Sequence, residues 1–295
     1  MTNPDGTERI FPTAEQDAAF SCHVTPSPQT LHPHYRLAFT DADFMLRDEL
    51  RPVRLQLELL KPEIVLQEYH IASTIVFYGS ARIPEPGAAY ARAATAHSER
   101  EHAVAARLAE KSHYYVEARR LAERISSIVQ PVPDERNFVV TSGGGPSIME
   151  AANRGAADAG APSIGLNIVL EHEQAPNMFV TPGLSFQFHY FAIRKMHFLM
   201  RARALCVFPG GFGTLDELFE VLTLIQTRKI KPVPVLLFGE AFWRRIVNFE
   251  ALAEEGVIAF DDLSLFRFVE TADEAWAYLA QELDLRLPVP QDQPV

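Results

Sequence analysis

The sequence predicts an α/β protein with a doubly wound, Rossmann-like parallel sheet and helices on both faces. Short β-branched or apolar runs recur from residue 73 onward, and segments with helical spacing separate them. Two of these runs end in glycine-rich turns that lead into a predicted helix. Parallel strands need long crossover connections, so this alternation is typical of strands joined by helices.

The predicted strands are "STIVFYG", "NFVVTS", "SIGLNIV", "ALCVFPG" and "PVPVLLFG". The span from Gly87 to Gln130 is long for one crossover, and its polar first half predicts an inserted helix near residues 91–112. The segment "DEAWAYLAQELDLRL" predicts a closing helix. We therefore expect one main domain at residues 71–285, followed by a C-terminal tail at 286–295.

Two further segments precede this domain. Residues 1–38 are rich in Pro, Ser, Thr and His and lack periodicity, which predicts a mobile or loosely docked tail. Residues 39–70 have mostly helical spacing, interrupted by Pro52 and Pro62. We expect an N-terminal helical extension of two or three short helices, because proline disrupts a helix interior.

Composition excludes several classes of protein. A formal net charge of -11 disfavours a broad surface for nucleic acid or anionic membranes, which requires excess Lys and Arg. The N-terminus lacks the basic and apolar regions of a signal peptide, and no apolar run approaches membrane-spanning length. Cys22 and Cys206 suit a reducing compartment, so we expect a cytoplasmic protein. The scattered histidines lack metal-ligand spacing, and no metal site is expected.

Three predicted strand-to-helix loops carry the candidate chemistry: "FYGSAR", "TSGGGPSIMEAANRGA" and "VFPGGFGTLDELFEVL". Ligands of doubly wound sheets bind beyond the carboxyl ends of the strands. Glycines allow the backbone to approach a ligand closely, and the free N–H groups at the start of a helix attract anions. Pro146 suits the first turn of the helix that follows the second loop. The loops therefore predict a phosphate site. Neither glycine-rich loop matches GxxxxGK[ST] or GxGxxG, which disfavours ATP hydrolysis and NAD binding.

The segment "FQFHYFAIRKMHFLMRARA" predicts a buried helix that is apolar nearly all round, with Arg194 and Lys195 midway. A buried guanidinium needs an anionic partner. Four roles are therefore open for Arg194: it pairs with a structural acid, lies on an exposed face, holds a ligand phosphate, or orients Glu217.

Glu217 has two interpretations. Thr214 to Glu217 fits a T-x-x-E capping box, in which the glutamate is the third helical residue. Alternatively, Glu217 is catalytic, and we favour this role because a carboxylate beside a bound phosphate costs energy unless it is used. Asp216 lies about 100° around the helix from Glu217 and does not form a facing acid–base pair with it.

These residues resemble the Lonely Guy (LOG) family, long labelled lysine decarboxylases. The motifs that carry the resemblance are "GSAR", "GGGPSIMEAANRGA", "IGLNIVLEHEQAPN", "RKM" and "PGGFGTLDE", in the order and spacing of that family between Ser73 and Leu283. The tail, the leading helices and the insertion fall outside it. One departure is Ser147, where relatives usually carry glycine.

The resemblance implies a nucleoside 5′-monophosphate phosphoribohydrolase, acting on AMP or a cytokinin riboside monophosphate, without a cofactor and as a homodimer. It implies Arg194 and Glu217 as catalytic residues. The implied substrate contacts are Gly79, Ser80, Arg82, Gly143, Gly144, Gly145, Met149, Glu150, Asn167, Lys195, Pro209, Gly210, Gly211, Gly213 and Thr214. A non-catalytic nucleotide-binding or carrier protein remains an alternative. A pyridoxal-phosphate decarboxylase would need a Schiff-base lysine, and only Lys195 lies near the predicted site.

Overall fold

The computed structural model describes residues 11–88, 97–171 and 175–288. The chain divides into two compact units, Met1–Glu58 and Leu59–Val295. The first unit contains α1 (Ala14–Ser21), α2 (Ala42–Met45) and the start of α3 (Arg51–Glu68). Neither α1 nor α2 has a buried residue. The expected tail at 1–38 thus includes a short helix, and its first ten residues lie outside the described ranges.

The expected interruption of the N-terminal extension at Pro62 is wrong. Helix α3 runs through Pro62 to Glu68. Pro62 lacks an N–H group, so one backbone hydrogen bond of the helix is missing. The packing of the buried Pro62 and Leu66 offsets this loss. Pro52 is the second helical residue, where an N–H group has no partner within the helix anyway.

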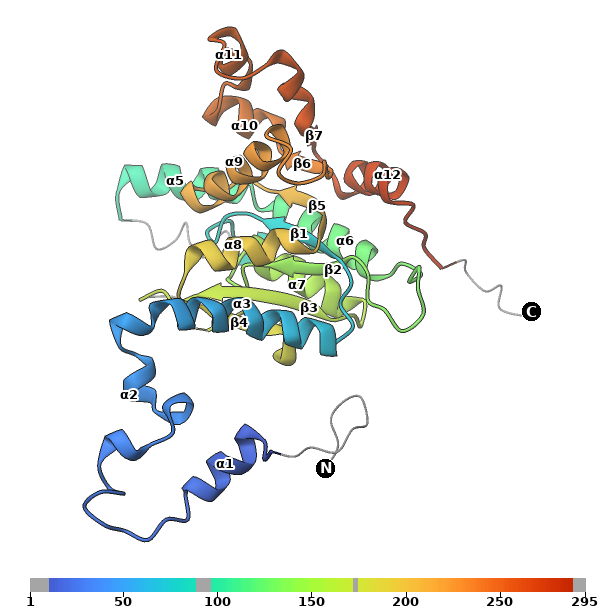
Figure 1. The fold of residues 1–295 in the computed structure, drawn as a ribbon. Helices are drawn as coiled ribbons and strands as arrows, with labels where there is room; N and C mark the ends of the chain where they lie inside the picture. Colours follow the sequence, from blue (N-terminus) through green and yellow to red (C-terminus); the bar gives the residue numbers. More distant parts are fainter. Residues whose placement is uncertain (1–10, 89–96, 172–174, 289–295) are drawn as a thin grey trace. The chain divides into compact units, whose positions relative to one another are not determined.

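The second unit is built on a seven-stranded sheet of order β4-β3-β2-β1-β5-β6-β7, in which every neighbouring pair is parallel (Figure 1). The strands are β1 (Thr74–Tyr78), β2 (Val139–Ser142), β3 (Ser163–Ile168), β4 (Ser185–Phe188), β5 (Ala202–Val207), β6 (Val235–Phe238) and β7 (Arg267–Val269). The predicted fold class and the five predicted strands are confirmed. Strands β4 and β7 were not predicted.

Strand β4 lies inside the segment expected to be one long helix. Phe186 and Phe188 are buried on either side of the exposed Gln187, which is the alternation of a strand. The helix in this segment, α8 (Phe191–Met200), starts later and buries only Arg194, His197 and Phe198. The expectation of an apolar helix buried all round is therefore wrong, since Phe191, Met196 and Met200 are about half exposed.

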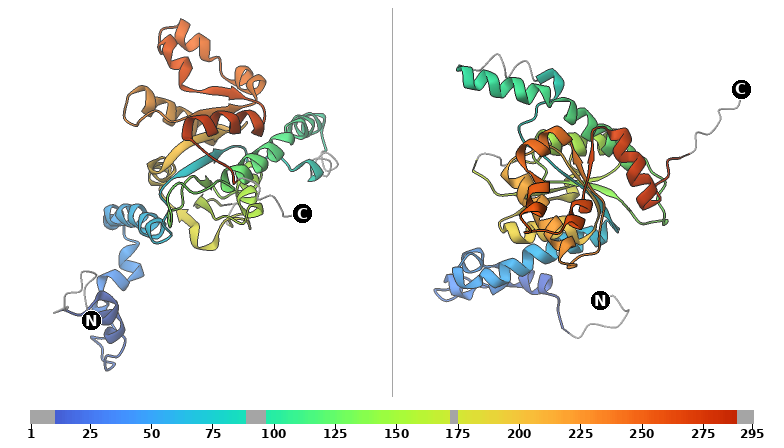
Figure 2. Two further views of the ribbon diagram at one scale, coloured as in Figure 1. Left: turned by 90° about the vertical axis from the view of Figure 1, so that its right-hand side faces the viewer. Right: turned by 90° about the horizontal axis from the view of Figure 1, so that it is seen from above.

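Residues alternate along the strands between two hydrophobic cores, one on each face of the sheet. Ile75 and Phe77 belong to one core, and Val76 and Tyr78 belong to the other. The first core also takes residues from α6 (His113–Ser126), α7 (Ile148–Asp158) and α12 (Ala272–Leu283). The second takes residues from α3, α8, α9 (Phe212–Gln226), α10 (Glu240–Ile246) and α11 (Phe249–Glu254). The sheet therefore lies between two layers of helices, as predicted (Figure 2).

The structure contains a helix within the predicted insertion and another at the position of the predicted closing helix. Helix α5 (Glu99–Glu110) occupies the described part of the insertion and buries only Ala105, whereas residues 91–96 lie outside the described ranges. Helix α12 is the closing helix, and most of the predicted C-terminal tail, 289–295, is likewise outside them. Among the described helices, none combines the length and apolar character required to cross a membrane.

Candidate functional site

A cavity of about 680 Å³ lies at the carboxyl ends of β1, β2, β3 and β5. The chain winds outward from β1 to β4 and then returns to the sheet centre at β5, so this crevice is the topological switch point where ligands of such sheets bind. Most of the predicted site residues line the cavity. They are Gly79, Ser80, Arg82, Gly143, Gly145, Met149, Asn167, Arg194, Gly210, Gly211, Gly213, Thr214 and Glu217.

Four predicted site residues are outside the lining: Gly144, Glu150, Lys195 and Pro209. Glu150 Oε1 accepts a hydrogen bond from the Tyr115 hydroxyl at 2.8 Å. The carbonyl of Pro209 accepts from the Ser80 amide at 3.1 Å and joins two of the loops.

The Gly143 loop contains two glycines that pack closely against site residues. A Cβ atom on Gly143 would lie 2.7 Å from Arg194 Nη2 and 2.8 Å from Met149 Sδ, so any side chain would displace the guanidinium. Gly144 has a φ of +73° and would bring a Cβ within 2.6 Å of the Asn167 amide. The backbone of this loop therefore packs directly against the two predicted site residues Arg194 and Asn167.

The end of the same loop differs from expectation. Helix α7 begins at Ile148, so the prediction that Pro146 lies in its first turn is wrong. The intervening residue, Ser147, has φ +67° and ψ -122°, a conformation that favours glycine. Its hydroxyl donates a hydrogen bond to the carbonyl of Ile83. Ser147 thus occupies a strained turn that its side-chain hydrogen bond holds in place.

Arg194 faces the cavity from α8 and is only 8% exposed. Its Nε donates to the carbonyl of Leu166 at 2.7 Å, and its Nη1 lies 3.6 Å from Glu217 Oε1. Its guanidinium carbon stands 5.0 Å from the ring centroid of Phe198. Burial lowers the pKa of Arg194, while the Glu217 carboxylate opposes that shift. Arg194 therefore both pairs with an acid and borders the cavity.

The capping interpretation of Glu217 is wrong. Helix α9 begins at Phe212 with the extended residue Gly211 as its N-cap, and within the described residues no side chain caps it. Thr214 is therefore the third helical residue and Glu217 the sixth, beyond the reach of the cap amide. The uncapped N–H groups of the first turn border the cavity beside Gly210 and Gly211, an arrangement that attracts anions.

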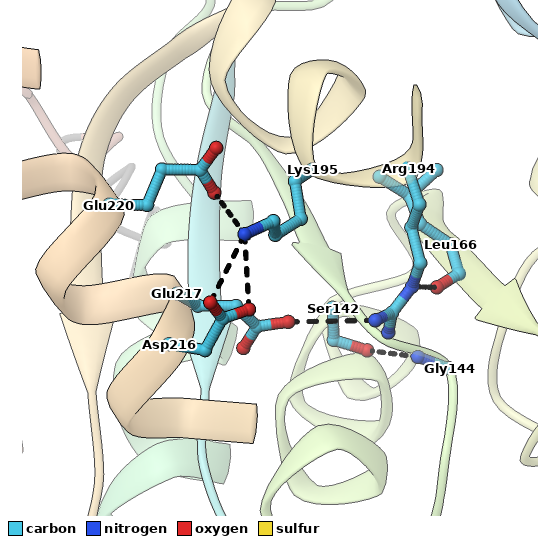
Figure 3. A network of polar contacts seen from close by, with 8 residues as sticks. All are labelled: Ser142, Gly144, Leu166, Arg194, Lys195, Asp216, Glu217 and Glu220. Carbon is cyan, nitrogen blue, oxygen red and sulfur yellow. Dashed lines mark hydrogen bonds and ion pairs between the residues drawn. The ribbon is translucent and has the colours of Figure 1, made fainter. Parts of the chain in front are cut away.

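The Glu217 side chain is 13% exposed. Burial raises the pKa of its carboxyl group to about 7, although the nearby Arg194 charge acts in the opposite direction. Figure 3 shows the carboxylate pointing toward the Arg194 guanidinium. A carboxyl group with a pKa near neutrality can accept or donate a proton at physiological pH.

Several cavity residues were missed by the sequence analysis. They are Ala81, Ile168, Leu170, Ala175, Phe191, Phe212, Leu215 and Ile246, which give the cavity an apolar portion. Phe212 could have been found from the sequence, because a large aromatic residue interrupts the glycine motif. In the structure it is 92% exposed. Ile246, at the end of α10, joins the site only through the tertiary fold.

The described residues include no group of three or more His, Cys, Asp or Glu side chains arranged to hold a metal ion. The described lining of the cavity contains no lysine either, and the Lys195 ammonium group is bound to Asp216 and Glu220. These contacts do not suit a Schiff-base lysine, which would have to face the ligand.

Residues 149–279 match the model of a protein family described as "Possible lysine decarboxylase". This segment, which includes Arg194 and Glu217, is similar to that family. A solved structure named TM1055 is 17% identical over 71% of this chain and 99% of its own, with a TM-score of 0.44. A Moco carrier protein from Chlamydomonas reinhardtii is 17% identical over 72% of this chain and 98% of its own, with a TM-score of 0.39. No curated protein matches the sequence.

Proposed function

We propose that the chain hydrolyses the N-glycosidic bond of nucleoside 5′-monophosphates, releasing a free base and ribose 5-phosphate. The observation that carries this proposal is the buried Arg194–Glu217 pair, which borders the same cavity as the uncapped start of α9. One part of the cavity suits an anion, and a carboxylate with a raised pKa stands next to it.

The 5′-phosphate is assigned to the first turn of α9. The backbone at Gly210, Gly211 and Gly213 can approach phosphate oxygens closely, and Arg194 offers a charged donor from the facing helix α8. Binding energy gained at the phosphate, which does not react, would hold the anomeric carbon C1′ in place. The apolar portion around Phe191, Phe212 and Ile246 suits a planar base.

Glu217 is assigned to the reaction itself. Cleavage of the bond between C1′ and the base nitrogen builds positive charge on the ribose, which a nearby carboxylate stabilises. Ionised Glu217 also accepts a proton from the attacking water, whose oxygen forms the new bond to C1′. The base leaves with the electron pair of the broken bond and takes up a proton from solvent, and Glu217 then releases to solvent the proton that it took from water. This sequence needs no cofactor.

AMP is the first substrate to test, with a cytokinin riboside monophosphate as the second. We further propose a cytoplasmic homodimer. The half-exposed Met196 and Met200, one turn apart on α8, favour such self-association, because apolar side chains on one helix face gain from being covered.

The deciding experiment incubates the protein with AMP and with adenosine, and separates the products by chromatography. We expect adenine from AMP and almost none from adenosine, because only AMP carries the phosphate. Equal turnover of both would contradict the phosphate assignment. A carrier protein would bind AMP in calorimetry and release no adenine. A screen of other nucleoside monophosphates then identifies the preferred base.

A further inference from the structure

Lys195 forms two further cross-helix ion pairs beside the Arg194–Glu217 pair. Its Nζ lies 3.1 Å from Asp216 Oδ2 and 3.2 Å from Glu220 Oε2. In Figure 3 the ammonium group stands between these two carboxylates, while Glu217 points away from it toward Arg194. Helices α8 and α9 are thus joined by three neighbouring ion pairs, and of these three only the Arg194–Glu217 pair lines the cavity.

The spacing places three carboxylates within about one turn of α9. Asp216 precedes Glu217 and Glu220 follows it by three residues, so both lie near it on the helix. Negative neighbours disfavour ionisation of a buried carboxyl group. The Lys195 charge opposes both neighbours at once, and its side chain is only 20% exposed, which limits screening by solvent.

We propose that Lys195 is a positioning residue that neutralises Asp216 and Glu220 and thereby holds Glu217 in its ionised form at neutral pH. This inference rests on the proposed function, because it assigns the ionised carboxylate to the hydrolytic step. It differs from the expected role of Lys195 as a substrate contact. The lysine acts here through α9, from outside the cavity lining.

Neither Arg194 nor Tyr78, which also act on Glu217, neutralises Asp216 and Glu220. Arg194, on α8, already forms the direct pair with Glu217. Tyr78, at the end of β1, has a pKa well above its usual range because it is buried and near the Glu217 charge, so its hydroxyl stays neutral. Burial brings the pKa of Glu217 to about 7, where a modest change in nearby charge alters the ionised fraction most.

The test compares Lys195→Gln, Lys195→Arg and a triple variant, Lys195→Gln with Asp216→Asn and Glu220→Gln. Lys229→Gln is the control, since it removes one exposed positive charge just after α9. The acidic limb of the pH profile of kcat/KM for AMP should move up by roughly half to one pH unit in Lys195→Gln. It should return toward the parent value in the triple variant and stay near it in Lys195→Arg and Lys229→Gln.

A direct titration makes the test independent of turnover. Carboxyl-labelled glutamate gives NMR signals whose pH dependence can be followed in the free protein, and Glu217→Gln assigns the signal of Glu217. An upward shift of the Glu217 titration in folded Lys195→Gln, absent from Lys195→Arg, supports the role of Lys195. This result stands even if no monophosphate is cleaved, because absent cleavage refutes only the proposed reaction. The proposed role of Lys195 is overturned if the Glu217 titration is unchanged in Lys195→Gln, or if it shifts equally in Lys195→Gln and Lys195→Arg.

Discussion

The Arg194 guanidinium and the Glu217 carboxylate lie 3.6 Å apart between helices α8 and α9, each with a side chain at most 13% exposed. The two residues come from the separate "RKM" and "PGGFGTLDE" motifs. Helix α8 follows β4 at one edge of the sheet, whereas α9 follows β5 beside the central strand β1. The fold therefore brings the two motifs together at the switch point.

Arg194→Ala should abolish base release while the chain remains folded. Loss of one partner of a buried pair typically costs about 3–5 kcal/mol, because a charge is left unpaired. Here the cost should be smaller, since Glu217 already has a raised pKa and can become protonated. Turnover of AMP and urea denaturation at neutral pH measure the two effects. A strongly destabilised variant whose folded fraction keeps full specific activity would show that Arg194 is structural.

Ser147 provides a test of strain in the glycine-rich loop. Ala is usually more stable than Gly by about 0.5–1 kcal/mol because it loses less entropy on folding. At position 147, with φ at +67°, we expect Ser147→Gly to be more stable than Ser147→Ala by about 1–2 kcal/mol. Both variants lose the hydroxyl bond to Ile83, so that bond cancels in the comparison. Thermal denaturation measures the order, and greater stability of the alanine variant would refute the strain.

The fold was readable from the sequence because its central strands are buried on both faces. Strands such as β1 and β5 appear as continuous apolar runs, and each leads into a recognisable loop. Strand β4 was missed because its four residues merge with the apolar residues of α8, and such a short alternation resembles part of a helix.

The site was predictable in its loops and less so in its contacts. The T-x-x-E pattern predicted Thr214 as the N-cap of α9, but the N-cap is the extended residue Gly211, so the helix begins earlier and Glu217 has no capping role. That Lys195 binds Asp216 and Glu220, rather than bordering the cavity, depends on how α8 packs beside α9. The sequence pattern contains no record of that packing.

Glu63, on α3, should contribute strongly to stability although it precedes the sheet in the sequence. It contacts Arg201 Nη1, and its Oε1 lies 3.5 Å from Nδ1 of the buried His197. We expect Glu63→Ala to lower the free energy of unfolding by about 3 kcal/mol, since Arg201 loses its carboxylate partner. Urea denaturation measures this change, with the exposed Glu68→Ala as control. Equal stability of the two variants would contradict a structural role for this ion pair.

Glu217→Gln should lower base release by on the order of a hundredfold or more, because an amide cannot accept the proton of water or stabilise a ribosyl cation as a carboxylate does. Nucleotide binding should survive, since the phosphate site on α9 is unchanged. Single-turnover adenine release and AMP calorimetry on one preparation measure both properties. Parental turnover in this variant would exclude Glu217 from the reaction.

The same variant should be more stable than the parent at alkaline pH. Burial raises the pKa of Glu217 from the ordinary value of 4.5 to about 7, so the folded state binds a proton more tightly than the unfolded state. The parent therefore loses stability as pH rises from 4.5 to about 7 and stays at the lower level above it. The amide of Glu217→Gln does not titrate, so the advantage of this variant should be about 1–3 kcal/mol at pH ~8 and vanish near pH ~4. Urea denaturation at both pH values, with the exposed Glu254→Gln as control, measures the difference. A variant less stable than the parent at alkaline pH would mean that the ion pair with Arg194 outweighs the cost of burying the carboxylate.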